Sequence, residues 1–340
     1  MSSETETFSI SGPSHLTAID WKNTYHRRCV VASLVQGVYI LERDRQQNRI
    51  GSQKALAPLW WNFFHFQLNN MLVDSADHSI FGAIFELKPC LNAPRFVIAF
   101  RGTLIESGTR SRDIHLDLKC IVNRLHKSSR FQLAIHSIQE TIGLAGASNV
   151  WLAGHSLGSA IALLAGKNMT KMGYPLETYL FNSPFVSAPL ERIKDQKVKH
   201  GIHIASSVVK AGLTVALKCQ HKQSKPQQDD PFVVLSYWIP HLFVNPADHI
   251  SSGYIDYFAH REKMEKIGAG KIEKLATKHT VESLLSGAIL DRISEPLHLL
   301  PSAELTINKS DSTNFRKAHG IEQWWDPTIH CPSLVYQYRY

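Results

Sequence analysis

Short apolar runs typical of strands alternate with longer segments whose apolar residues recur at helical intervals, starting at residue 79. The strand-like runs are residues 79–87, 95–100, 149–153, 179–181 and 242–244. The clearest helix-like segments are residues 113–144 and 156–172, and Gly173 ends the second of them. Strands and helices in alternation predict a mostly parallel sheet with helices on both faces, which is an α/β fold.

Length and composition are those of a globular protein, with 340 residues, 44% hydrophobic and 19% charged. This length is enough for two ordinary domains, yet α/β folds often hold as many residues around one sheet. We expect one domain over residues 1–340, with an N-terminal extension at 1–75 and a helical addition at about 254–301. Residues 254–267 and 271–289 have the pattern of amphipathic helices, and residues 219–231 that of a polar loop.

The net charge of +8 raises the question of an anionic partner. The sequence has no zinc-finger, RNA-recognition or basic-helix signature, so we expect no nucleic-acid partner. The charge is interpreted as a surface property that favours peripheral contact with an anionic membrane. The five cysteines include no C-x-x-C pair, and we expect free thiols and no metal site.

The first twenty residues are polar and acidic, without the pattern of a signal or transit peptide, so the expected location is cytoplasmic. The most apolar early window, residues 56–73, contains several asparagines and is too polar to span a bilayer. Its crowded aromatic side chains favour core packing. The wall of an apolar pocket is the alternative.

The strongest chemical motif lies between the strand at 149–153 and the helix that follows it. Gly154, His155, Ser156, Leu157 and Gly158 fit the G-x-S-x-G nucleophile elbow. A serine on so sharp a turn needs small residues two positions before and after it, so that helix and strand can approach. Ser156 is therefore the predicted nucleophile of an acyl-transfer reaction, and His155 is interpreted as packing around the elbow.

The start of the helix after Ser156 also suits an oxyanion. Free N–H groups and the helix dipole stabilise the negative oxygen that forms when a carbonyl is attacked. The backbone N–H of Leu157 is the first expected donor. The second is expected in the loop after the strand at 95–100, where the sequence reads Phe-Arg-Gly-Thr. Because N–H groups alone can stabilise the oxyanion, the mechanism requires no metal and no cofactor.

Three segments, RFVIAFRGT, GHSLGSAIALLAG and FNSPFVS, occur in this order. Together they resemble the lipase class 3 (fungal-lipase-like) family, especially its plant members. The resemblance implies an α/β-hydrolase fold and assigns Thr103 to the oxyanion hole. The third segment departs from the family pattern, with Asn182 in place of glycine and Phe185 in place of arginine.

In α/β-hydrolases the triad follows the chain order serine, carboxylate, histidine. Asp248 ends the segment Asn-Pro-Ala-Asp after the strand at 242–244 and is similar to the family's N-x-x-D segment, so it is the preferred carboxylate. A turn in which this aspartate only caps the backbone is the alternative. Asp229, Asp230 and Asp256 are less well placed, two in a polar loop and one in a helix pattern.

Six histidines follow Asp248 and are candidates for the base: His249, His260, His279, His298, His319 and His330. His319, in KAHGIEQWW, resembles the family's late A-H-x-x-[YWF] loop and is preferred. His298 and His330 stay open as alternatives.

These residues predict a serine esterase or lipase that hydrolyses carboxylic esters through an acyl-enzyme on Ser156. An ester or lipid substrate is implied, with triacylglycerol, galactolipid, phospholipid and soluble esters all open. The alternative is a non-catalytic lipase-like scaffold that binds a lipid or a partner protein, because a fold alone does not establish activity. The sequence assigns no oligomeric state.

Overall fold

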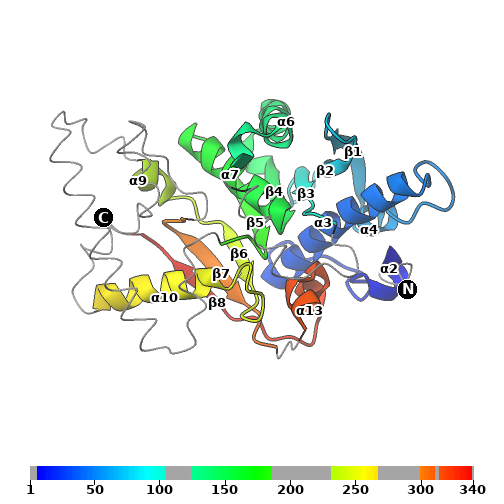
Figure 1. The fold of residues 1–340 in the computed structure, drawn as a ribbon. Helices are drawn as coiled ribbons and strands as arrows, with labels where there is room; N and C mark the ends of the chain where they lie inside the picture. The colour runs from blue at the N-terminus through cyan, green and yellow to red at the C-terminus, as the bar shows by residue number, and fades with distance from the viewer. Residues whose placement is uncertain are drawn as a thin grey trace.

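The computed structural model describes residues 6–104, 122, 124–185, 231–266, 299–310 and 314–338. Within these residues, one eight-stranded sheet has its strands in chain order, from β1 at one edge to β8 at the other (Figure 1). The strands are β1 (Phe66–Val73), β2 (Ile80–Leu87), β3 (Phe96–Phe100), β4 (Val150–His155), β5 (Glu177–Phe181), β6 (His241–Val244), β7 (Ala303–Ile307) and β8 (Ser333–Tyr336).

The five central strands, β3 to β7, are parallel, and the strands at both edges pair antiparallel. Parallel neighbours need a crossover between them, and α6 (Ser129–Ala145) and α7 (Leu157–Lys171) supply the first two. The mostly parallel sheet with helices on both faces confirms the expected α/β-hydrolase fold. The carboxyl ends of β3, β4, β5 and β6 meet along one edge, where ligands bind in open α/β sheets.

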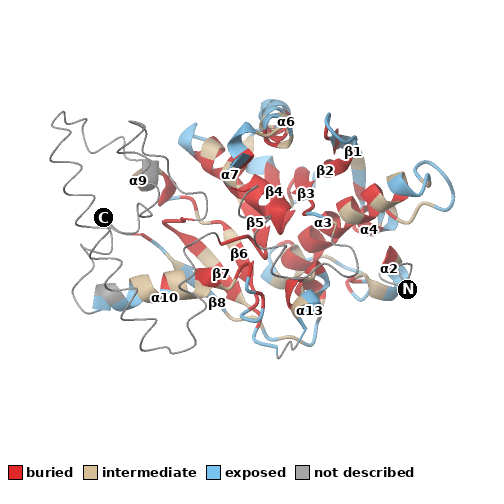
Figure 2. Cartoon of the chain, viewed as in Figure 1, coloured by how far each residue is buried: buried red, intermediate tan, exposed pale blue. Residues whose placement is uncertain are grey.

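Helices cover both faces of the sheet, and each face has its own hydrophobic core (Figure 2). One core is formed with α6, α7, α9 (Pro231–Leu235) and α10 (Gly253–Lys266). The other is formed with α3 (Thr24–Gln46), α4 (Leu59–Asn62) and the 3-10 helix η5 (Ile321–Trp325). Strand alternation divides β4 between them, since Leu152 packs into the first core and Trp151 and Ala153 into the second.

Helix α3 is the main element that the sequence analysis did not identify. Asn23 caps it by accepting a 2.9 Å hydrogen bond from the Tyr25 amide. The helix is buried at nearly every position in its middle, so it has no polar stripe to reveal a helical period. Much of the expected N-terminal extension is therefore part of the fold: β1 belongs to the sheet, and α3 and α2 (Phe8–Ser11) pack in the hydrophobic core on one of its faces.

The predicted strands agree with β2 to β6, and the helix after Ser156 agrees with α7. Of the helix expected at 113–144, residues 129–144 belong to α6, which Ser128 caps, and Val122 and Arg124 are also helical; residues 105–121 lie outside the described part. The aromatic window at 56–73 forms α4 and then strand β1, with its large rings in the core as preferred. The helix expected at 271–289 and the loop at 219–230 lie outside the described residues.

Strands β7 and β8 were not predicted, because each is short and stands apart from the alternating pattern. In the described ranges, no helix is both long and apolar enough to cross a membrane.

Candidate active site

Ser156 lies on a sharp turn between β4 and α7, with φ 54° and ψ −125°. This is a left-handed conformation that a residue with a side chain rarely adopts, and strain of this kind is typical of a nucleophile elbow. The two glycines of the motif allow the start of α7 to pack closely against strands β3 and β4. A methyl group on Gly154 would overlap the Gly158 carbonyl, and one on Gly158 would overlap the Phe100 carbonyl at the end of β3.

The loop after β3 lies directly beside the elbow. A methyl group on Gly102 would come within 2.8 Å of the Ser156 Cβ. The buried Arg101 guanidinium holds this loop, because its Nε donates to the Ile80 carbonyl at 2.6 Å and its Nη1 to the Gly102 carbonyl at 2.7 Å. Thr103 follows and is exposed, whereas Leu157 is the first residue of α7, where helical N–H groups have no intrahelical acceptor.

Asp248 and His319 are in direct contact, with 3.0 Å between Asp248 Oδ2 and His319 Nδ1. Asp248 is fully buried and also accepts hydrogen bonds from Asn182 Nδ2, Ser251 Oγ and the Ile250 amide, at 2.7, 2.7 and 3.1 Å. Burial alone would raise the pKa of this carboxyl group. The charge and hydrogen bond of His319, together with the hydrogen bonds from Asn182 and Ser251, outweigh burial and lower the pKa below its usual value, so Asp248 is an anion at neutral pH.

The second ring nitrogen of His319, Nε2, is buried and has no hydrogen-bond partner in the described part of the chain. No bond therefore joins it to Ser156 Oγ in this structure. Hydrogen bonds of catalytic groups are often long without substrate and shorten in the complex. His319 ends the short helix α13 (Phe315–His319), and its ring stacks on Phe315 with 5.4 Å between centroids.

His155 does more than pack around the elbow. Its Nε2 lies 2.7 Å from the His319 carbonyl oxygen, and its Nδ1 lies 2.8 Å from the Tyr39 hydroxyl. The Tyr39 oxygen also accepts a 2.7 Å hydrogen bond from the Gly102 amide. Burial is the main cause that lowers the pKa of His155, and the charge of the neighbouring His319 lowers it further, to about 3. This imidazole is therefore neutral.

These contacts determine the donors and acceptors. The neutral His155 has one N–H, which donates to the His319 carbonyl, because a carbonyl can only accept. Nδ1 then accepts from the Tyr39 hydroxyl. A chain of three hydrogen bonds thus connects the Gly102 amide, beside the elbow, to the backbone of His319.

The other sequence candidates lie elsewhere or outside the described residues. His330 is exposed, and His249 is exposed with its ring tilted against Phe315, at 4.6 Å between centroids. Asp256 lies in the first turn of α10. Residues His298, His279, Asp229 and Asp230 are outside the described part of the chain.

Asn182 is a site residue that the sequence analysis treated only as a departure from the family pattern. Its φ of 48° explains why the pattern has glycine there, and asparagine is among the few other residues that tolerate this conformation. Its amide group donates to Asp248 and to the Ala318 carbonyl, at 2.7 and 3.1 Å. Its oxygen accepts from Trp324 Nε1 at 2.7 Å. The sequence signal that could have identified it was asparagine in place of the glycine of the family pattern.

A cavity of about 250 Å³ adjoins His319, His155 and Thr103. Its apolar lining comes from Ile40, Leu104, Phe315 and Ile321, and its charged lining includes Arg43 and Arg316. The aromatic residues at 60–66 are not among its lining residues. Among the described residues, no group of three His, Cys, Asp or Glu side chains is arranged to hold a metal ion.

Comparison with known proteins gives three similarities. The family model for lipase (class 3) matches residues 115–209. A protein of Arabidopsis thaliana named a GDSL esterase/lipase is 49% identical over 354 residues, covering 100% of both chains. The present chain has no Gly-Asp-Ser-Leu tetrapeptide; its Ser156 lies in Gly-His-Ser-Leu-Gly. The solved lipase of Rhizopus microsporus var. chinensis matches 49% of this chain and 60% of its own length, at 17% identity and a TM-score of 0.30, too low to support an argument.

Proposed function

Because the chain belongs to the lipase class 3 family and is a carboxylic ester hydrolase, we propose that it acts through a Ser156–His319–Asp248 triad and an acyl-enzyme on Ser156. The contact between Asp248 and His319, buried at the carboxyl edge of the sheet beside the strained Ser156 turn, is the observation that carries the proposal.

In the first half of the reaction, Ser156 Oγ attacks the ester carbonyl carbon and its proton passes to His319 Nε2. That nitrogen is suited to receive the proton, because it has no other hydrogen-bond partner in the described residues. The Asp248 carboxylate stabilises the imidazolium through Nδ1. The tetrahedral intermediate then breaks its C–O bond, and the alcohol leaves with the proton from His319.

In the second half, water attacks the acyl carbon and gives its proton to His319. The bond to Ser156 Oγ breaks, Oγ recovers the proton, and a carboxylic acid is released. In both halves the negative oxygen is stabilised by the Leu157 N–H and by the backbone and hydroxyl of Thr103. Arg101 supports this second group through the Gly102 carbonyl.

For the substrate, we propose an ester with an apolar acyl chain, such as a lipid. The cavity beside His319 supports this, because Ile40, Leu104, Phe315 and Ile321 form an apolar wall. Each methylene group buried there contributes up to about 0.8 kcal/mol, or about fourfold in kcat/KM. A series of p-nitrophenyl esters of increasing chain length measures this; values of kcat/KM that stay level with length would contradict an apolar acyl site.

The test of the nucleophile is Ser156→Ala. Hydrolysis of a short-chain ester should fall by about 10⁴-fold, because the triad no longer has a nucleophile. Ser159→Ala is the matched control, since Ser159 is buried one turn away in α7 and its hydroxyl has no hydrogen-bond partner among the described residues. Equal turnover by wild type and Ser156→Ala would overturn the assignment.

A further inference from the structure

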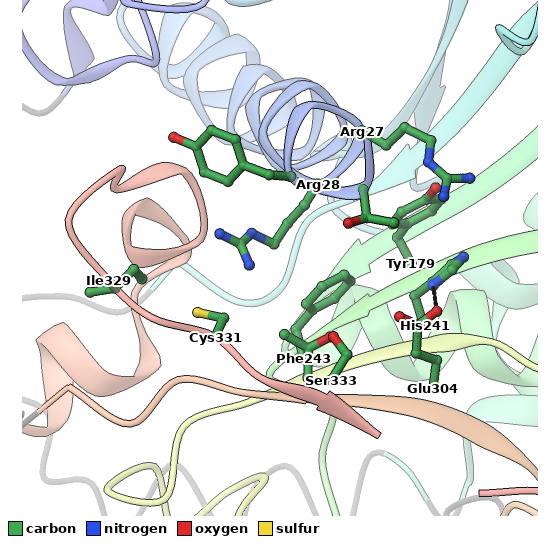
Figure 3. A pocket seen from close by; sticks show the side chains of 12 residues that line it. Arg27, Arg28, Tyr179, His241, Phe243, Glu304, Ile329, Cys331 and Ser333 are labelled. Atoms are coloured by element: carbon green, nitrogen blue, oxygen red, sulfur yellow. Dashed lines mark hydrogen bonds and ion pairs between the residues drawn. The ribbon is translucent and has the colours of Figure 1, made fainter. Parts of the chain in front are cut away.

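A second cavity, of about 210 Å³, lies between the start of α3 and the sheet (Figure 3). Its sheet residues are spread over strands β5 to β8 and include Tyr179 in the middle of β5, His241 at the start of β6 and Thr306 near the end of β7. Ser156, Asn182 and Asp248 follow the carboxyl ends of strands β4, β5 and β6. The second cavity shares no lining residue with the cavity beside His319, so the two are separate sites.

Four charged groups at this cavity neutralise one another. The ring nitrogens of His241 contact Glu177 at 2.7 Å and Glu304 at 2.8 Å. Arg27 contacts Glu177 at 3.4 Å. Burial alone would lower the pKa of His241, but hydrogen bonds and charge from the two glutamates raise it to about 9. At neutral pH, two cations thus face two carboxylates.

Arg28 is a fifth charged group, and it has no carboxylate of its own. Arg28 is only 7% exposed. Its Nε donates to the Trp324 carbonyl at 2.9 Å, and its side chain also forms a hydrogen bond with the Cys331 thiol. The guanidinium lies 5.1 Å from the centre of the Tyr25 ring. Figure 3 shows it extending from α3 toward Cys331 and Phe243. No ion pair involves Arg28 within the residues that the structure describes.

Two weakly acidic side chains beside Arg28, the Tyr25 hydroxyl and the Cys331 thiol, are uncharged. Burial raises the pKa of the Cys331 thiol and of the Tyr25 hydroxyl, so neither supplies a negative charge at physiological pH. Asp326, in the same loop as Trp324, accepts hydrogen bonds from the amide and hydroxyl of Thr328, at 2.8 and 2.6 Å. Arg28 is thus in ion-pair contact with no carboxylate among the described residues, and a buried cation without such a contact is costly.

We propose that this cavity is a binding site for a small organic carboxylate, whose two oxygens pair with the Arg28 guanidinium. A guanidinium binds a carboxylate through two parallel, charge-assisted hydrogen bonds. The walls formed by Tyr25, Tyr179 and Phe243 suit a flat or short apolar substituent on the carboxylate. The volume of about 210 Å³ suits a small ligand.

The charge balance selects a monoanion. A single negative charge neutralises Arg28. A phosphate dianion would bring a second negative charge close to Glu177 and Glu304, which are already paired with Arg27 and His241.

The test is titration calorimetry with benzoate, which combines one carboxylate with one flat ring. Benzoate should bind the wild-type chain at one site, and benzyl alcohol, which has the ring without the charge, should not bind. Arg28→Met should weaken benzoate binding by about 10- to 100-fold, which corresponds to a hydrogen bond to a charged group. Arg316→Met, at the cavity beside His319, is the matched control and should bind as wild type does.

Three results would overturn the proposal: no benzoate binding, equal binding by Arg28→Met, or tighter binding of inorganic phosphate than of benzoate. A second measurement needs no variant. Crystals of the full chain soaked with p-bromobenzoate should show an anomalous bromine peak in the cavity lined by Arg28 and Phe243. A bromine peak found only elsewhere, for instance beside His319, would also overturn it.

Discussion

The side-chain amide of Asn182 donates a 2.7 Å hydrogen bond to the Asp248 carboxylate from a position where the family pattern has glycine. The same amide donates to the Ala318 carbonyl, one residue before His319. Asn182 thus joins the end of β5, the carboxylate and the loop of the proposed base. Asn182 keeps the left-handed backbone conformation for which the family pattern has glycine, and it adds a polar side chain at that position.

Asn182→Gly removes these hydrogen bonds while keeping a residue suited to a φ of 48°. A hydrogen bond to a charged group contributes about 1.5–3 kcal/mol, so we expect kcat/KM for ester hydrolysis to fall by about 10- to 100-fold. The pKa of Asp248 should rise with the loss of this donor.

Asn182→Ala is the paired variant; it should also unfold at a lower denaturant concentration, because alanine is strained at positive φ. Wild-type kinetics in Asn182→Gly would refute a role for the amide.

The Tyr39 hydroxyl connects the Gly102 amide to His155, so Tyr39→Phe should misplace residues 101–103, the loop of the proposed oxyanion hole, relative to the elbow. We expect kcat to fall by about tenfold with little change in KM, since the lost bonds support the transition state rather than the bound ester. Tyr174→Phe, at an exposed tyrosine, is the control. A Tyr39→Phe enzyme with raised KM and unchanged kcat would show that the hydroxyl serves substrate binding instead.

His241 should make stability depend on pH. The folded-state pKa is about 9, above the ordinary value of 6.5, because Glu177 and Glu304 outweigh the opposing effect of burial. Its stabilising contribution is therefore complete below about pH 6.5 and is lost as the pH rises through 9. We expect the difference in free energy of unfolding between wild type and His241→Gln to shrink over this range in urea titrations.

The exposed pair of His136 and Glu140 in α6 provides the control for this experiment. The difference between wild type and His136→Gln should be small at every pH, since exposed ion pairs contribute little. A difference for His241→Gln that stays constant from pH 6.5 to 9 would mean that His241 is not charged in the folded protein.

The two elbow glycines should tolerate no side chain. Gly158→Ala places a methyl group against the carbonyls of Phe100 and Arg101, which are backbone atoms that cannot move aside cheaply. We expect a loss of more than about 3 kcal/mol in unfolding free energy, or failure to fold. Gly143→Ala in α6 is the contrast, because nothing lies within 4 Å of the added methyl group. There we expect a gain of up to about 1 kcal/mol. Equal stability of the two variants would contradict the close packing of the elbow.

The features that could be predicted from the sequence are those that depend on residues close together in the chain. Strand β4, the turn at Ser156 and helix α7 are contiguous, and their small residues and apolar runs indicate each element directly. The alternation of strands and helices also predicted the mostly parallel sheet, but not the order of its strands. Asp248 and His319 were chosen by family resemblance and chain order, and the structure places them 3.0 Å apart.

The features that could not be predicted depend on contacts between distant segments. Tyr39 lies inside a helix that is buried on almost every side, so no periodic pattern singles it out. His155 is next to Ser156 in sequence, yet its partners come from residues 39 and 319. In the sequence, Arg28 is one of many cations of a basic chain. Only the fold shows that it is buried and forms no ion pair with a carboxylate in the described residues.

The most direct test of the central claim is covalent labelling with a fluorophosphonate, followed by mass spectrometry of the labelled peptide. The probe reacts only with a serine that a neighbouring base activates. We predict one labelled residue, Ser156, in the wild-type chain, and loss of most labelling in His319→Ala. Absence of label on Ser156, or equal labelling of wild type and His319→Ala, would contradict a catalytic triad built from Ser156, Asp248 and His319.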